Sequence, residues 1–156
     1  MRLATHAAVG AGVAAYTYVL VDRSLVGLII AVLASLVVNI LVDAFGHHHR
    51  LFKPPRRTKL THSLPGIVAI SLAISYLSIR GVPLTLRQEA GIILAVLAGG
   101  LSHWLLDALT PSGVYVVRRR VRIARIPYWS TTANTIFQMI GGALLAYSLY
   151  IVLKSP

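Results

Sequence analysis

A chain of 156 residues that is 56% hydrophobic, only 12% charged and carries a net charge of +11 has the composition of a basic membrane protein, because soluble domains average about 25% charged residues. Its length suits one compact unit, so we expect residues 1–156 to form a single integral membrane domain. The absence of cysteine excludes disulfides, thiolate metal sites and cysteine nucleophiles, and neither a phosphate-binding glycine motif nor the G-x-S-x-G motif of serine hydrolases occurs.

Five hydrophobic segments follow one another along the chain, at about residues 7–21, 25–45, 64–79, 90–109 and 133–153. A helix needs about 20 apolar residues to span a bilayer. The second, fourth and fifth segments are long enough, whereas the first and third span only if flanking residues enter the headgroup region or the bilayer thins locally. We interpret the first segment as retained, not as a cleaved signal peptide. The sequence therefore predicts an all-α, polytopic membrane helix bundle of about five hydrophobic helices.

The basic residues are concentrated in two of the connecting loops. With five spans, these loops share one side of the membrane with the N-terminus, and eleven of the fifteen basic residues fall on that side. The positive-inside rule places the N-terminus and both loops in the cytoplasm and the C-terminus outside the cell membrane. The loop residues are Arg50, Lys53, Arg56, Arg57 and Lys59 in the first loop, and Arg118, Arg119, Arg120, Arg122 and Arg125 in the second.

The second basic loop contains the stretch YVVRRRVRIARI at residues 115–126. Arginine and aliphatic residues alternate from Arg120 to Ile123, and this period of two predicts a short basic strand-like loop on the membrane surface. One face would contact lipid and the other would bind anions, although a stop-transfer patch would explain the same residues. Membrane lipids are favoured over nucleic acid as the partner, since no nucleic-acid-binding module is recognisable.

Side chains that can bind metal ions lie at the predicted cytoplasmic ends of four segments. In GGLSHWLLDALTPSG, His103 and Asp107 are one helical turn apart and point the same way. His6 and His62 begin the first and third segments, and Asp43 ends the second. Ionisable residues at such depths are costly and mark functional sites. Imidazole and carboxylate from several helices can bind zinc or another divalent metal.

Each of these residues also has a structural explanation. His103 and Asp107 could be a hydrogen-bonded pair that holds two helices together. Histidines 47–49 could lie in a hydrated loop, although His47 follows Asp43 by four residues and is a candidate ligand. We interpret Asn39 as an interhelical hydrogen-bonding residue and not as the partner of a ligand. The common depth of residues from four segments favours the metal site.

The segments LSHWLLDALTPSGV, LTHSL and LVDAFGHHH, with TH at residues 5 and 6, resemble the YdjM-like family of membrane-bound metal-dependent hydrolases. The family pattern is an N-terminal histidine, D-x-D-H, H-R-G-x-T-H and S-H-x-x-x-D-x-x-T-P-x-G. The resemblance covers most of the chain and implies phosphoester hydrolysis at a cluster of divalent metal ions, as in zinc-dependent phospholipase C. Matched position by position, it marks His6, Asp43, His62, His103 and Asp107, with Thr110 nearby.

The chain departs from this pattern at two motifs. Phe45 and Gly46 replace the second aspartate and the histidine of D-x-D-H, and only a shift of one residue brings His47 into register. Arg57 replaces the first histidine of H-R-G-x-T-H, and Lys59 replaces its glycine. A mononuclear site and a site that has lost catalysis both stay open.

The sequence thus leaves two classes of function. The first is a membrane-embedded hydrolase, using zinc or manganese, that cleaves a phosphoester or phospholipid-type substrate at the cytoplasmic face; a metal-bound water with a pKa of roughly 7 would be its nucleophile. The second is a non-catalytic protein whose polar residues stabilise the bundle and whose basic loops bind lipid or a partner. The expected catalytic residues are Asp43, His62, His103 and Asp107, and the expected metal ligands are these four with His6 and His47.

Overall fold

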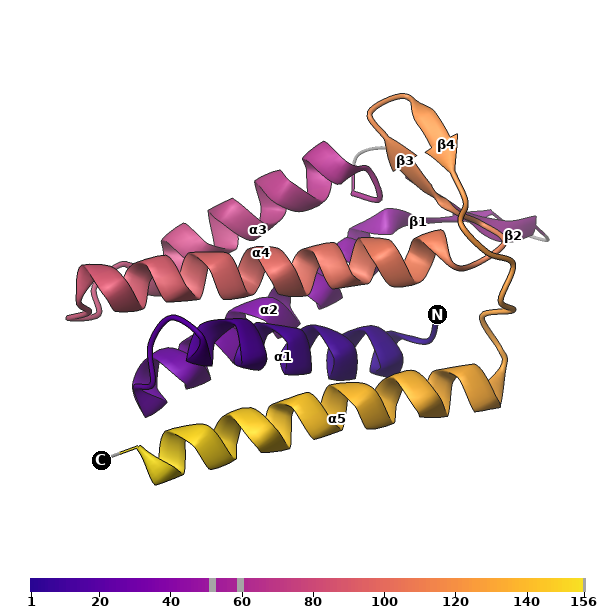
Figure 1. Cartoon of the computed structure of the whole chain (residues 1–156). Coiled ribbons are helices and arrows are strands. Elements are labelled where there is room, and N and C mark those ends of the chain that lie inside the picture. The colour runs from indigo at the N-terminus through magenta and orange to yellow at the C-terminus, as the bar shows by residue number, and fades with distance from the viewer. Residues whose placement is uncertain (51–52, 59–60, 156) are drawn as a thin grey trace.

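Five helices make up most of the computed structural model, which describes residues 1–50, 53–58 and 61–155, and the side chains of all of these except 46–50 and 53–57. They alternate in direction, so the N-terminus and both long connections lie at one end and the C-terminus at the other (Figure 1). The helices are α1 (Leu3–Val19), α2 (Leu25–Gly46), α3 (Leu64–Ile79), α4 (Leu86–Ala108) and α5 (Thr131–Lys154).

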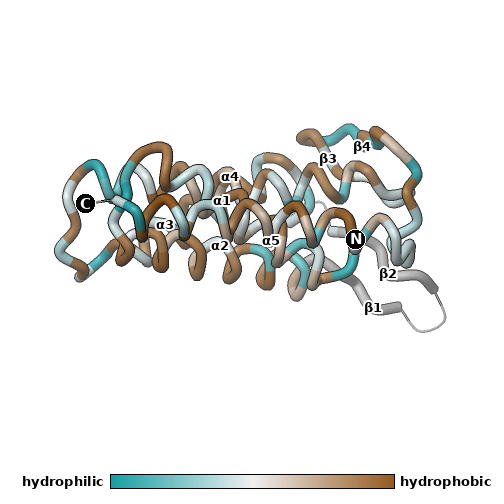
Figure 2. The backbone as a smooth tube through the Cα atoms, turned by 60° about the horizontal axis from the view of Figure 1, so that its bottom comes forward, coloured by the Kyte–Doolittle hydropathy of each residue, from teal (hydrophilic) through white to brown (hydrophobic). Residues whose placement is uncertain are grey.

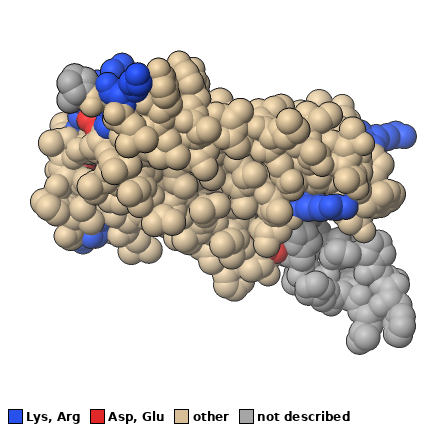
Figure 3. Space-filling view, turned by 90° about the horizontal axis from the view of Figure 1, so that it is seen from below, with Lys and Arg blue, Asp and Glu red and all other residues tan. Residues whose placement is uncertain are grey.

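The bundle has the surface of a membrane protein. Helices α2, α4 and α5 are long and apolar enough to cross a membrane, and α3 is a shorter apolar helix. Hydrophobic residues follow the helices along the body, and hydrophilic ones gather toward its two ends (Figure 2). In the face shown in Figure 3, lysine and arginine likewise lie toward the ends, with an uncharged belt between them. These features confirm the predicted all-α membrane bundle.

Local capping signals set where the helices begin. Thr85 and Gln88 form a capping box, in which each side chain accepts a hydrogen bond from the other's backbone amide. Helix α4 therefore starts at Leu86, before the predicted segment 90–109, because its first turn is polar and hydropathy alone misses it. Ser63 and Ser130 cap α3 and α5 through their hydroxyl oxygens.

Helix α1 lies in the centre of the bundle, packed against α2, α4 and α5. Ala14, Ala15 and Tyr18 are completely buried in this position. Because α1 faces mainly other helices and not lipid, small residues that allow close approach replace the large aliphatic residues of a lipid-facing span. This explains why the hydropathy pattern predicts only the short segment 7–21. The helix itself begins at Leu3, and its first residues are less hydrophobic than a lipid-facing span requires.

The contact between α1 and α5 depends on two glycines. A methyl group on Gly12 would overlap the backbone at Gly141, and one on Gly141 would overlap the backbone at Ala8. Gly142, the next residue on α5, has open space around its Cβ position among the described residues. The two adjacent glycines therefore differ sharply in what they tolerate.

Replacing Gly141 by leucine should destabilise the bundle by about 1–3 kcal/mol, because the side chain must force α1 and α5 apart. Gly142→Leu is the matched control and should change stability by no more than about 0.5 kcal/mol, since its side chain points into free space. Unfolding titrations in mixed micelles measure both. Equal midpoints for the two variants would contradict the close helix contact.

The two connections at the N-terminal end are β-hairpins. Strand β1 (His47–Arg50) pairs antiparallel with β2 (Lys53–Arg57), and β3 (Val114–Val116) pairs antiparallel with β4 (Arg119–Val121). The second hairpin confirms the predicted basic strand-like loop, although the strand ends before Arg122 and Ile123. The Ile123 amide instead donates to the carbonyl of Ala108, which ties the chain back to α4. The first hairpin was not predicted, because its sequence lacks alternation.

Two of the four acidic residues of the chain, Asp22 and Glu89, lie at the end of the bundle that holds the C-terminus. Asp22 lies between α1 and α2. Its burial opposes ionisation, but hydrogen bonds from Ser24 and Tyr18 and the charge of Arg87 outweigh this and lower the pKa of Asp22 below its usual value. Asp22 is therefore held in place by donors around it and has a structural role.

Candidate metal centre

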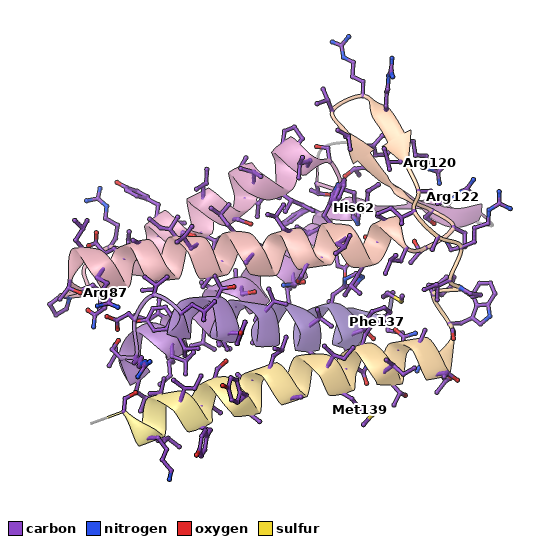
Figure 4. The ribbon with its side chains drawn as sticks, in the orientation of Figure 1. His62, Arg87, Arg120, Arg122, Phe137 and Met139 are labelled. Atoms are coloured by element: carbon purple, nitrogen blue, oxygen red, sulfur yellow. The ribbon has the colours of Figure 1, made fainter. Side chains whose placement is uncertain are left out.

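Three histidines and two aspartates meet at the end of the bundle that holds the N-terminus. His6 comes from the second turn of α1, Asp43 from the end of α2, His62 from the turn before α3, and His103 and Asp107 from the last two turns of α4. The side chains are at most 1% exposed, except that of Asp43, which is 17% exposed. Figure 4 shows His62 between the start of α3 and the end of α4, beneath the β3–β4 hairpin. Residues from α1, α2, α4 and the turn before α3 thus form a polar cluster that is almost completely shielded from solvent.

The Asp107 carboxylate joins the three histidines. Its Oδ1 lies 3.1 Å from His6 Nε2. Its Oδ2 lies 3.4 Å from His62 Nε2 and 3.6 Å from His103 Nε2. Asp43 Oδ1 lies 3.6 Å from His103 Nε2 as well. The Nε2 atoms of three histidines and two carboxylates therefore face one small volume.

These separations are close to those around a shared metal ion, and because the His6 and His103 rings are stacked, with centroids 3.9 Å and planes 18° apart, one of these rings must turn before both bind the same ion. Ligand atoms about 2.0–2.2 Å from a tetrahedral zinc ion lie about 3.3–3.6 Å from one another, close to the distances within the cluster. Two sets of three residues each place their ligand atoms within 4.8 Å of one another and could hold an ion. They are His6, Asp43 and His103, and His62, His103 and Asp107.

Contacts behind the cluster orient its histidines. Thr61 Oγ1 lies 3.0 Å from His62 Nδ1, and the Tyr115 amide of β3 donates to the His62 carbonyl at 3.0 Å. Asn39 Oδ1 lies 2.9 Å from His103 Nδ1. In both histidines the Nδ1 atom is engaged by a neighbour while Nε2 faces the cluster, as is usual for metal-binding histidines.

Some of these neighbours were missed or only partly predicted from the sequence. Asn39 forms an interhelical hydrogen bond, as the sequence indicates. Its partner is His103, a candidate ligand, so Asn39 is both an interhelical hydrogen-bonding residue and the partner of a ligand. Thr61 gave no separate signal, because threonine is common beside a helix start. The α-amino group of Met1 lies 3.4 Å from Asp107 Oδ1, which nothing in the sequence indicated.

Other residues named from the sequence lie at the edge of the cluster or outside the described part. His47 begins β1, but its side chain, like those of His48 and His49, lies outside the described residues. Thr110 is buried, and its hydroxyl donates to the backbone carbonyl of Asp107 at 2.8 Å, which closes the end of α4.

Two arginines of the second basic loop, Arg120 and Arg122, make contacts with the loop that follows α4. Arg120 donates to the carbonyl of Ser112, and Arg122 donates to the carbonyl of Pro111 at 3.3 Å. Figure 4 shows Arg120 on strand β4 and Arg122 directly after it, near His62. They therefore fix the loop after α4, and their exposed guanidinium groups keep positive charge at this end of the bundle.

Comparison with known proteins links the cluster to one family. The family model described as YdjM inner membrane protein matches residues 1–155. This range includes all five residues of the cluster and both hairpins. No curated protein and no solved structure matches the chain.

Proposed function

Because this chain belongs to the YdjM inner membrane protein family, we propose that it is a membrane-embedded metal-dependent hydrolase whose metal centre is the buried histidine–aspartate cluster. The observation that carries the proposal is the convergence of His6, His62 and His103 on Asp107, with separations of 3.1–3.6 Å between ligand atoms. The separations at 3.4 and 3.6 Å are too long for good hydrogen bonds, but they suit atoms around one ion.

The charges of the cluster also support a bound cation. Asp107 is 1% exposed and Asp43 is 17% exposed, and two carboxylates brought together in a protein interior repel each other. The Met1 ammonium, 3.4 Å from Asp107 Oδ1, balances one of these charges. A divalent ion with neutral imidazoles would balance the rest and offset the cost of burying the carboxylates. Nitrogen and oxygen ligands without thiolate suit zinc and also manganese.

The residues of the cluster have separable roles in this proposal. His103 would hold the ion in either set, together with His6 and Asp43 or with His62 and Asp107. In the second set Asp43, the most exposed of the five, would be free of the ion and could accept the proton of an attacking water. When bound, a divalent ion would polarise a phosphoryl oxygen and lower the pKa of water toward about 7.

The surroundings support a phosphorylated substrate at the membrane surface. Tyr128 and Trp129 are exposed in the connection between the basic hairpin and α5, and such aromatic residues are enriched at the level of lipid headgroups. The exposed arginines at the same end can attract and neutralise phosphate. We infer that the substrate is a phosphoester, of the kind found in phospholipid headgroups, approached from the cytoplasmic face.

One observation favours a non-catalytic alternative. The 3.1 Å contact between His6 and Asp107 is short enough to be an ordinary interhelical hydrogen bond. In that case the cluster would only stabilise the bundle, and the basic loops would bind lipid or a partner.

Metal analysis of the purified protein separates these two functions. After incubation with zinc or manganese and removal of loosely bound ions, we expect about one ion per chain and slow hydrolysis of a generic phosphodiester or a phospholipid. A protein that stays metal-free after this treatment would contradict the metal centre. Stoichiometric metal without hydrolysis would support the metal centre but contradict the hydrolase activity.

The orientation of the bundle is a further prediction. A reporter inserted near Lys53 should give a cytoplasmic signal, and a reporter after Pro156 should give an external one, because five spans place these points on opposite sides. Paired fusions to alkaline phosphatase and a fluorescent protein measure this. The same side for both positions would mean that one of the five helices does not span.

A further inference from the structure

Asn39 lies directly behind the cluster, one helical turn below Asp43 on α2. Its side chain is completely buried. Its Oδ1 lies 2.9 Å from His103 Nδ1, which connects α2 to α4. The Nε2 atom on the other side of the same imidazole faces Asp43 and Asp107, each at 3.6 Å.

The orientation of the Asn39 amide follows from its second contact. The Asn39 Nδ2 group donates to the carbonyl of Ser35 at 2.8 Å. A backbone carbonyl can only accept, so the NH2 group must face Ser35 and the oxygen must face His103. The flipped amide would bring two oxygens to that distance, which is repulsive.

This orientation determines where the proton of His103 lies. Asn39 Oδ1 can only accept a hydrogen bond, so His103 Nδ1 must donate it. A neutral imidazole carries one N–H, which leaves Nε2 with a lone pair. That atom makes no hydrogen bond within the described part of the chain, and it faces two carboxylates that cannot donate when ionised.

We propose that Asn39 is a positioning residue that holds His103 in the Nδ1–H tautomer and so presents Nε2 as a ligand atom for a single ion. This inference rests on the proposed function. His103 belongs to both sets of three candidate ligands, and its Nδ1 is committed to Asn39, so it cannot bridge two ions. The two sets therefore cannot both be occupied at the same time, which favours a mononuclear centre.

The packing around Asn39 supports this role. Gly10 of α1 lies against the Asn39 amide, and a methyl group there would overlap it. The Ser35 hydroxyl donates to the Gly10 carbonyl at 3.1 Å, which holds α1 and α2 together at this point. The amide thus has little freedom to turn away from His103.

The tautomer can be observed without metal. Metal-free protein with 15N-labelled histidine should show the His103 proton on Nδ1 by NMR, at a pH about two units above the ordinary histidine pKa of about 6.5. The spectrum of His103→Gln assigns the signal. In Asn39→Ala the proton should move wholly or partly to Nε2, because Nδ1 then loses the acceptor that faces it.

Zinc affinity gives the second measurement. Asn39→Ala should weaken zinc binding about 10–100-fold, the usual effect of removing the partner of a histidine ligand. Ser148→Ala is the control, because Ser148 is a buried polar residue of α5 whose hydroxyl donates to the Leu144 carbonyl of the same helix. It should leave the tautomer and the affinity unchanged.

The outcomes separate this inference from the proposed function. A proton on Nε2 of metal-free wild-type His103, or wild-type zinc affinity in Asn39→Ala, would overturn the role of Asn39. Two zinc ions per chain would overturn the mononuclear centre. If wild-type protein binds no zinc, the proposed function fails, but the tautomer measurement still decides what Asn39 does.

Discussion

Replacing Asp107 by asparagine should remove the metal ion and the hydrolytic activity while leaving a folded protein. The substitution keeps the size and the hydrogen-bonding capacity of the side chain, but it removes the charge that faces three histidines at 3.1–3.6 Å. Loss of a partner behind a ligand typically costs 10–100-fold in metal affinity. Loss of a ligand that joins three others should therefore cost more than about 100-fold.

The chain offers a matched control for this experiment on the same helix. Glu89 lies in the first turn of α4, at the opposite end from Asp107. Glu89→Gln removes the same charge and should leave metal content unchanged. Mass spectrometry of metal in wild type, Asp107→Asn and Glu89→Gln measures the effect. Equal metal in wild type and Asp107→Asn would exclude Asp107 as a ligand.

The second large effect is expected at His103. It contributes to both sets of three candidate ligands, so His103→Gln should abolish stoichiometric metal binding. His6→Gln leaves the set of His62, His103 and Asp107 intact. His62→Gln leaves the other set. The affinity lost at His103 should exceed the loss at either of the others by at least about tenfold, because zinc sites need three or four protein ligands.

Zinc titration of the three variants in detergent measures this order. Their circular dichroism spectra without metal control for folding, since each variant replaces a buried histidine with a side chain of similar polarity. Equal losses in all three variants would contradict the special position of His103 and would mean that the three histidines bind the ion on equal terms.

The helices of the bundle are predictable from the sequence, because the thickness of the bilayer sets the length of the apolar segments that span it. The segment 64–79 matches α3 in full, and 25–45 falls one residue short of α2. The hydropathy pattern predicts the starts of α1 and α4 four residues too late, because polar residues in a first turn resemble a loop. The central place of α1 could not be predicted, since the pattern of one segment does not say which helices surround it.

The residues of the cluster could be selected from the sequence because topology fixes depth. His6, Asp43, His62 and Asp107 fall at one predicted level, and a bundle of five helices is narrow enough to bring such residues together. Rotation of each helix about its axis is not encoded so simply. The contact of Asn39 with His103 depends on how α2 and α4 are turned toward each other, so its partner was not predictable.

The central position of α1 has a consequence for how the protein is made. About 110 residues separate the end of α1 from the start of α5, and ribosomes add about 5–20 residues per second. For a time on the order of 10 s, the side of α1 that holds Thr5 and Gly12 must wait without α5, which packs against it. A nascent chain arrested before α5 would expose this side of α1 to lipid, and membrane chaperones or proteases that recognise weakly hydrophobic helices would act on it first.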